Sequence, residues 1–376
     1  MREIELKAHW ESRLDQWAGA GLIDAAAAER IRDFEAKREK DRGMRWPVLV
    51  AIGLGGLLLG AGVLLFVAAH WDKLAPGERF GMVLLLIGLF HSGGALAAGR
   101  FAVLSTALHA IGTICLGAGI FLTGQIFNLQ EHWPGGVMLW ALGAWAAWAL
   151  LRDWPQSALV AVLSPMWLLC EWIEVVLSRQ GAGRILVEGV LLLSITYLTA
   201  VLPGKETPAR KALVWIGGLM LIPSTFVLMH VSIFSFFSTP SPLPLKYQVL
   251  GWTAAMTLPI LLAWCLRGKE FWMNLVAGLW VVGLGAAGYL GSHVMCALGS
   301  IGSIAWGIRE GRKALINLGI AGFALTVVSF YFSMIFDKLG RSTALAGMGI
   351  LFLAGGWLLE KMRRKLTARL EEKGKA

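Results

Sequence analysis

Residues 47–69 read PVLVAIGLGGLLLGAGVLLFVAA, a run of 23 residues without a charged side chain. A transmembrane helix needs about 20 predominantly apolar residues to cross a hydrocarbon core of about 30 Å. The run ends in His70, Trp71 and Asp72. Since tryptophan is enriched where a membrane helix meets the headgroups, this pattern predicts a spanning helix that leaves the bilayer at Trp71.

The composition extends this conclusion to most of the chain. Of its 376 residues, 57% are hydrophobic and only 15% are charged, whereas about a quarter of the residues of a soluble domain are charged. Similar apolar runs recur between charges and prolines, and they predict an all-α, polytopic membrane helix bundle with about twelve transmembrane helices. The predicted spans are 47–69, 80–98, 101–123, 134–151, 155–178, 184–202, 212–234, 247–266, 271–290, 293–308, 314–336 and 342–359.

The basic residues predict how these spans are oriented. If both chain ends are cytoplasmic, the cytoplasmic segments carry 27 Lys and Arg and the opposite loops carry seven. This asymmetry agrees with the positive-inside rule and favours an N-in/C-in layout. The bilayer thus accounts for the net charge of +10, and we expect a lipid partner and no nucleic acid.

The chain is predicted to have three parts. Residues 1–46 hold ten basic and ten acidic side chains and are expected to form a cytoplasmic helical hairpin, in which Asp24 caps a second helix with Ile31 and Phe34 inward. So small a core favours support from the membrane domain or from a cytoplasmic protein partner. Residues 47–360 form the bundle, and the basic tail 361–376 is expected to bind anionic lipid headgroups.

Three stretches together resemble a known family. They are Trp17 with Gly21-Leu-Ile, the segment GLGGLLLGAGVLLFVAAHWDKL at 53–74, and GQIFNLQEHWPGGVMLW at 124–140. With these stretches the chain resembles the bacterial membrane proteins grouped as domain of unknown function 2157, and the likeness covers residues 1–150. Where the family pattern has Asn-Trp-Asp, this chain has His70-Trp71-Asp72. The resemblance implies a multi-pass inner-membrane protein and no particular function.

Two histidines are the clearest titratable groups at membrane depth. His91 and His109 lie within the second and third predicted spans. Ionisable groups inside a bilayer are costly and mark functional sites more often than surface charges do. Two interpretations stay open: a neutral histidine that hydrogen-bonds a neighbouring helix, or a proton-relay or ligand site.

Three carboxylates lie near one end of their spans. Glu171 and Glu174 are three residues apart, hence on one helix face, and Glu188 belongs to the following span. Arg179 and Arg184 lie in the connecting loop and are expected to pair with Glu171 and Glu174. The alternative is a site for a cationic or polyol ligand.

Further polar residues are predicted at the outer ends of spans. Together with the residues above, they form our candidate ligand-binding set: His70, Asp72, His91, His109, Gln125, Asn128, Glu131, His132, Glu171, Glu174 and Glu188. The sequence cannot show whether side chains on different helices converge, so we predict no metal site, cofactor or catalytic residue. The four cysteines are dispersed within apolar runs and are expected to be buried, inert thiols.

Three functions compete. Transport or flipping of a small molecule or envelope lipid is favoured by the span count and by Pro165, Pro223 and Pro259, which are expected to break helices at a midplane site. A membrane-embedded enzyme or receptor would use the polar residues of the outer face. A non-catalytic scaffold or sensor would need only the N-terminal hairpin. A cavity that reaches His91 and His109 favours the first, and an outer polar pocket the second.

Overall fold

The computed structural model divides the chain into two compact units, Met1–Ala75 and Pro76–Ala376, which are described one at a time. The described residues are 14, 16–42, 75–126, 132–176, 179–202, 204, 206–229 and 239–335, with single positions 54, 58, 347, 349, 350, 353 and 357. Among them, the chain is helical apart from two short strands and the connecting turns.

The first unit contains helix α2 (Ala25–Arg42). Asp24 precedes it, and its Oδ1 accepts a hydrogen bond of 2.6 Å from the Ala27 backbone N–H, so the predicted N-cap is confirmed. The expectation that Ile31 and Phe34 point inward is wrong, because they are 38% and 63% exposed. Helix α2 is crowded with charged residues, so its apolar side chains form no stripe wide enough to be buried.

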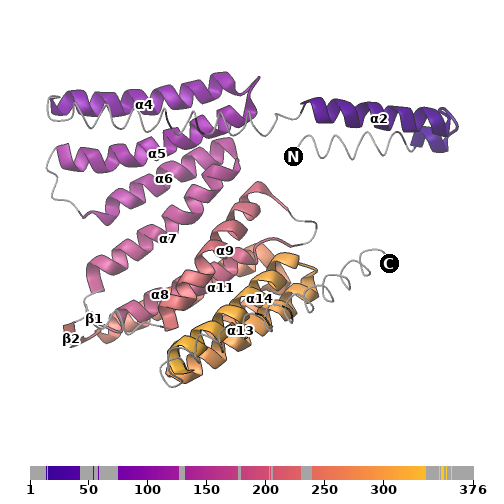
Figure 1. Ribbon diagram of the computed structural model, residues 1–376. Coiled ribbons are helices and arrows are strands. Elements are labelled where there is room, and N and C mark those ends of the chain that lie inside the picture. The colour runs from indigo at the N-terminus through magenta and orange to yellow at the C-terminus, as the bar shows by residue number, and fades with distance from the viewer. Residues whose placement is uncertain are drawn as a thin grey trace. The chain divides into compact units, whose positions relative to one another are not determined.

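The second unit contains ten long helices among the described residues, and they coincide with the second to eleventh predicted spans (Figure 1). They are α4 (Pro76–Ala97), α5 (Ala102–Ile126), α6 (Pro134–Leu151), α7 (Trp154–Val176), α8 (Ala182–Leu198), α9 (Pro208–Met229), α11 (Leu245–Arg267), α12 (Trp272–Ala286), α13 (Tyr289–Glu310) and α14 (Lys313–Phe330). The predicted spans 47–69 and 342–359 lie almost wholly outside the described residues.

Seven segments of the described chain are long and apolar enough to cross a membrane, and one of them, Leu245–Ala286, contains both α11 and α12. This finding supports a multi-pass membrane protein. The total of twelve spans and the N-in/C-in orientation remain predictions.

Prolines mark where helices begin and do not interrupt them. Helices α4, α6 and α9 begin at Pro76, Pro134 and Pro208, which suits proline because its missing N–H is not needed in the first turn. Pro165, Pro223 and Pro259 lie inside the unbroken helices α7, α9 and α11. The expectation that these prolines break their helices is therefore wrong. Membrane helices tolerate proline because neighbouring helices and local adjustments of the backbone satisfy the groups that it frees.

Helix α8 is the buried centre of the second half of the unit. Its Leu191 and Leu192 pack with Val281 and Leu284 of α12, and most of its length is inaccessible. Helix α9 approaches it so closely at Gly217 that a Cβ there would lie 2.3 Å from the Leu198 nitrogen. This close approach explains why a glycine stands at that position.

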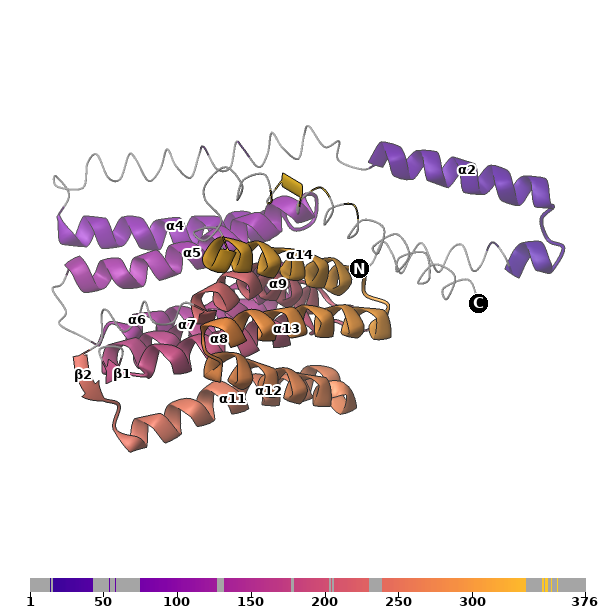
Figure 2. The ribbon, with the colours of Figure 1, turned by 60° about the horizontal axis from the view of Figure 1, so that its bottom comes forward.

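Two short strands pair with each other: one follows the end of α7 and the other precedes the start of α11. Strand β1 (Arg179–Gln180) runs parallel to β2 (Thr239–Pro242), and Figure 2 shows the two strands side by side. The Arg179 guanidinium donates to the Ser241 hydroxyl at 2.8 Å. Since the two strands are 60 residues apart in sequence, this pairing joins segments that hydropathy alone does not relate.

The four cysteines are free thiols. Cys170 and Cys296 are buried as expected, but Cys115 is only partly buried and Cys265 is exposed. An apolar run does not tell which of its residues face the lipid.

Candidate functional site

The start of α6 and the end of α7 bring three predicted site residues together. The His132 Nε2 lies 2.6 Å from Glu171 Oε2, and the other oxygen of Glu171 accepts from the Trp167 indole at 2.9 Å. The neighbouring Trp133 indole donates to Glu174. This His132–Glu171 cluster is partly exposed, so it can meet a polar ligand, but its carboxylates already have partners from the chain itself.

The predicted pairing of Arg179 and Arg184 with Glu171 and Glu174 is wrong. Arg184 pairs with Glu188 at 2.7 Å, one helical turn further along α8, and Arg179 binds Ser241. The Glu188 side chain is fully buried, and a Cβ on Gly285 of α12 would clash with it. Glu188 therefore belongs to the contact between α8 and α12, whereas Glu171 and Glu174 belong to the contact between α6 and α7.

The two histidines of α4 and α5 face each other. The Nδ1 atoms of His91 and His109 lie 3.1 Å apart. A hydrogen bond between them needs one ring nitrogen to donate and the other to accept. Each ring also packs on a glycine of the opposite helix, since a Cβ on Gly94 would meet His109 and one on Gly112 would meet His91. The pair joins α4 to α5 within the length of the two helices.

The remaining candidates are less informative. Gln125 lies near the end of α5 and is exposed. His70, Asp72, Asn128 and Glu131 lie outside the described residues. Among the described residues, no group of three or more His, Cys, Asp or Glu side chains is arranged to hold a metal ion.

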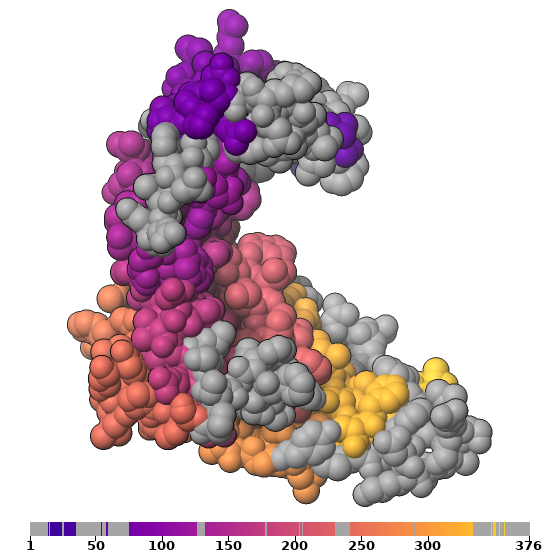
Figure 3. Space-filling model, turned by 90° about the vertical axis from the view of Figure 1, so that its left-hand side faces the viewer, coloured from indigo at the N-terminus to yellow at the C-terminus, as the bar shows by residue number. Residues whose placement is uncertain are grey.

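A cavity of about 1090 Å³ lies among α8, α9, α12, α13 and α14. At one end it is lined by Trp272, the first residue of α12, and at the other by Met229, the last residue of α9. Along α13 the lining extends from Cys296 to Arg309, about 20 Å at 1.5 Å per residue. The space-filling view shows α14, in yellow-orange, at the surface of this unit (Figure 3).

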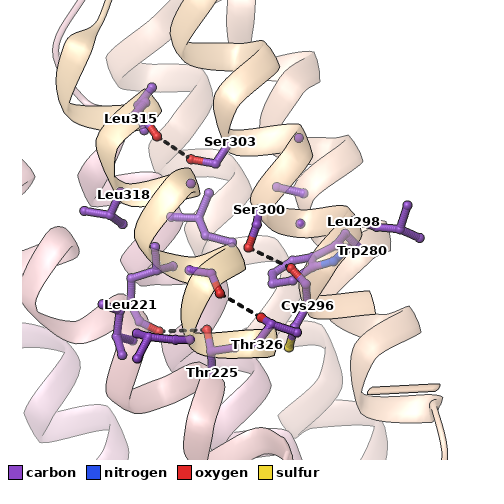
Figure 4. Close-up of a pocket in the computed structure, with 18 of the residues that line it drawn as sticks. Leu221, Thr225, Trp280, Cys296, Leu298, Ser300, Ser303, Leu315, Leu318 and Thr326 are labelled. Carbon is purple, nitrogen blue, oxygen red and sulfur yellow. Dashed lines mark hydrogen bonds between the residues drawn. The ribbon is translucent and has the colours of Figure 1, made fainter. Parts of the chain in front are cut away.

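The wall of this cavity is chemically apolar, although serine and threonine line part of it. The Ser300 hydroxyl donates to the Cys296 carbonyl and the Thr225 hydroxyl to the Leu221 carbonyl, while Ser303 donates across to the Leu315 carbonyl (Figure 4). Their donors are thus used within the protein. What the cavity offers a ligand is mainly carbon surface, from residues such as those labelled Leu318, Leu298 and Trp280 in Figure 4.

An arginine cluster closes the C-terminal end of α8 beside the cavity. Three consecutive carbonyls there each accept from a different guanidinium: Leu198 from Arg312, Thr199 from Arg267 and Ala200 from Arg210. The cations complement the negative end of the α8 dipole. Arg267 is fully buried and also binds Glu310, the last residue of α13. The cluster fixes α9, α11 and α13 to the end of α8.

Sequence reasoning missed most of this cavity: none of the candidate ligand-binding residues lines it, and of the three prolines expected at a midplane site only Pro223 does. Most of its lining residues are apolar or small, such as leucine, glycine and serine, and these residue types are ordinary in a membrane helix. The signals available were the serines and glycines of α13, which give this helix a polar face, but such residues are as typical of close helix packing as of a cavity.

These elements define a helical membrane protein that crosses the bilayer several times. The family described as "Predicted membrane protein (DUF2157)" matches residues 15–157, which confirms the resemblance over that part of the chain. The match extends from the N-terminal unit into the first turn of α7. Neither the comparison with curated proteins nor that with solved structures gives a match.

Proposed function

We propose that this protein binds a lipid-like molecule in the cavity among α8, α9, α12, α13 and α14, and moves it within or across the membrane. The observation that carries the proposal is the size and the wall of the cavity. Sites for drug-sized ligands measure about 300–1,000 Å³, so 1090 Å³ accommodates a somewhat larger molecule. The carbon surface suits hydrocarbon.

The chemistry of the wall supports an apolar occupant, because water solvates the carbon surface that lines the cavity poorly. Water is a poor filling, since a buried water needs two to four polar partners and the hydroxyls of the wall are already bonded. Hydrocarbon therefore fills the cavity best.

The shape supports movement rather than storage alone. The lining extends from the α12 start to the α9 end, so a chain inside it passes along most of the length of the helices. A hydrocarbon core is about 30 Å thick and one leaflet about half of that. A cavity wall of about 20 Å along α13 exceeds one leaflet, which favours transfer between leaflets over holding a lipid in one of them.

Photolabelling tests the binding step. A phospholipid with a diazirine at the end of one acyl chain is incorporated with the full-length protein into nanodiscs, and labelled residues are mapped by mass spectrometry. We expect labels on cavity residues such as Trp280 and Thr326. Gly302 lines the cavity, and a Cβ there meets nothing within 4 Å, so Gly302→Phe should fill space without clashing and reduce these labels several-fold.

The matched control is Gly88→Phe, since Gly88 also has open space around its Cβ but lies on α4 away from the cavity. It should leave the cavity labels unchanged. Labels confined to lipid-facing residues such as Leu279 would contradict the proposal. So would a crosslink showing that residues 342–359 of the same chain occupy the cavity.

A second assay tests movement. Proteoliposomes with a fluorescent lipid in both leaflets are treated with dithionite, which bleaches only the outer leaflet. The wild-type protein should raise the bleached fraction above one half, and Gly302→Phe should abolish this increase. A bleached fraction of one half with the wild-type protein would limit the function to binding, and an equal increase with both proteins would show that lipid moves by a route other than the cavity.

A second candidate function rests on the His132–Glu171 cluster. The 2.6 Å contact joins the His132 and Glu171 side chains, which are both titratable and partly exposed. A receptor or enzyme site for a polar ligand would use accessible groups of this kind. The Glu171→Gln variant considered below tests this candidate.

A further inference from the structure

One charged side chain interrupts the apolar wall of the cavity. Arg309 is the single Asp, Glu, Lys, Arg or His among the described residues that line it. It lies one residue before the end of α13, beside the turn that leads into α14. A long chain in the cavity would therefore have one of its ends next to a guanidinium.

The contacts that Arg309 makes are weak enough to be exchanged for contacts with another anion. Its Nη2 lies 3.3 Å from Glu270 Oε2, in a pair whose side chains are 52% and 45% exposed. Exposed pairs of this kind are worth little, because water competes for both charges. The guanidinium also lies 5.1 Å from the centre of the Trp272 ring, which leaves its edge able to bind a second anion.

The turns around Arg309 carry more positive than negative charge. Arg267 and Glu310 neutralise each other, and beyond that pair the segments 268–271 and 309–313 contain Lys269, Arg309, Arg312 and Lys313 against Glu270. An anion arriving at this end of the bundle would meet a positive potential.

We propose that the cavity selects amphiphiles with an anionic headgroup, which Arg309 binds in exchange for Glu270 while the hydrocarbon chain lies among α9, α12, α13 and α14. The inference rests on the proposed binding of a lipid-like molecule and adds the chemistry of its headgroup. A guanidinium forms paired hydrogen bonds with both phosphate and carboxylate. A phospholipid and a fatty acid are the two sources of that chemistry.

The test compares probes that share one pyrene-labelled chain and differ in the headgroup: phosphoglycerol, phosphocholine, the uncharged diacylglycerol and the free fatty acid. Binding to the full-length protein in detergent micelles is followed by energy transfer from tryptophan to pyrene. Only the signal that Gly302→Phe removes is counted, since this part comes from the cavity. We expect the wild-type protein to bind the phosphoglycerol probe about tenfold more tightly than the diacylglycerol probe.

Two variants should move this preference in opposite directions. Arg309→Gln should weaken phosphoglycerol binding about tenfold and leave diacylglycerol binding unchanged. Glu270→Gln, which removes the competing carboxylate, should tighten phosphoglycerol binding about threefold. The matched control is Lys211→Gln, because Lys211 forms an equally exposed pair with Glu206 at 2.9 Å and does not line the cavity. This variant should leave the affinity for both probes unchanged.

The outcomes separate the two proposals. Equal affinity for the phosphoglycerol and diacylglycerol probes, or an equal loss for both in Arg309→Gln, overturns the headgroup inference and leaves the lipid cavity intact. If no probe gives a signal that Gly302→Phe removes, the proposed function itself fails. A preference of the wild type for phosphoglycerol over the fatty acid assigns the source to phospholipid, and the reverse preference assigns it to fatty acid.

Discussion

Helices α4–α7 and helices α8–α14 use polar groups in different ways. In the first region titratable side chains pair across neighbouring helices while remaining partly accessible, as His91 does with His109 and His132 with Glu171. In the second region charge is buried against a helix end, and Arg267 has no exposed side-chain surface. The comparison suggests that the first region is joined by modest contacts, whereas buried charge holds a rigid frame beside the cavity of the second.

The largest expected effect comes from removing the centre of the arginine cluster. Arg267→Met retains an apolar stem of similar shape but removes the guanidinium that binds the Thr199 carbonyl and the Glu310 carboxylate. Breaking a buried ion pair costs about 3–5 kcal/mol, so the unfolding temperature in detergent should fall sharply. Lys211→Gln, which breaks the exposed pair with Glu206, should cost less than about 1 kcal/mol. Similar losses in the two variants would remove the contrast between buried and exposed charge.

A glycine tests the first region. Gly112→Ala places a methyl group 2.8 Å from the His91 ring, so the ring must move and its hydrogen bond with His109 lengthens. Overpacking of this kind costs about 1–3 kcal/mol. Gly88→Ala on α4 meets no neighbour and should be neutral or stabilising by up to about 1 kcal/mol, because alanine favours helix. Thermal unfolding measures both, and equal stability of the two variants would show that the histidine pair is loosely packed.

A smaller effect on stability is expected at the His132–Glu171 cluster. Glu171→Gln retains hydrogen-bonding capacity toward His132 and Trp167 but loses the charge, and a partly exposed pair is worth less than about 1 kcal/mol. Membrane insertion should remain intact while function is impaired. Fractionation and a complementation assay measure the two properties. Wild-type complementation would remove Glu171 from the candidate site and leave the cavity as the functional centre.

The two regions also differ in how far the sequence predicted them. Ten helices lie at predicted spans because hydrophobicity and helix length are local properties. His132 and Glu171 were predicted as candidates, since polar residues stand out in an apolar chain, but their contact depends on how α6 packs on α7. Arg184 was expected to form an ion pair with Glu171 or Glu174, but it pairs with Glu188 instead. The cavity is a property of several helices together, so no single segment reveals it.

The smallest expected effect concerns Asp153, in the turn between α6 and α7. Its Oδ1 accepts from the Gln156 backbone N–H at 3.0 Å. Burial raises the pKa of the Asp153 carboxyl above its ordinary value of 3.8, and that hydrogen bond and the nearby His109 offset the rise only in part. The folded protein thus retains this proton to higher pH than the unfolded chain does. The corresponding stability is fully present below pH 3.8 and is lost as the pH rises through the raised pKa.

Asp153→Asn should abolish this pH dependence, because asparagine caps a helix about as well as aspartate and carries no charge. At pH 7 the variant should match the wild type within about 0.5 kcal/mol or slightly exceed it. At pH 4 the wild-type protein should have gained stability relative to the variant, compared with their difference at pH 7. Unfolding temperatures in detergent at the two pH values provide the measurement. A variant that is clearly less stable at pH 7 would mean that the charged carboxylate itself stabilises this turn, so that the first region also depends on a buried charge.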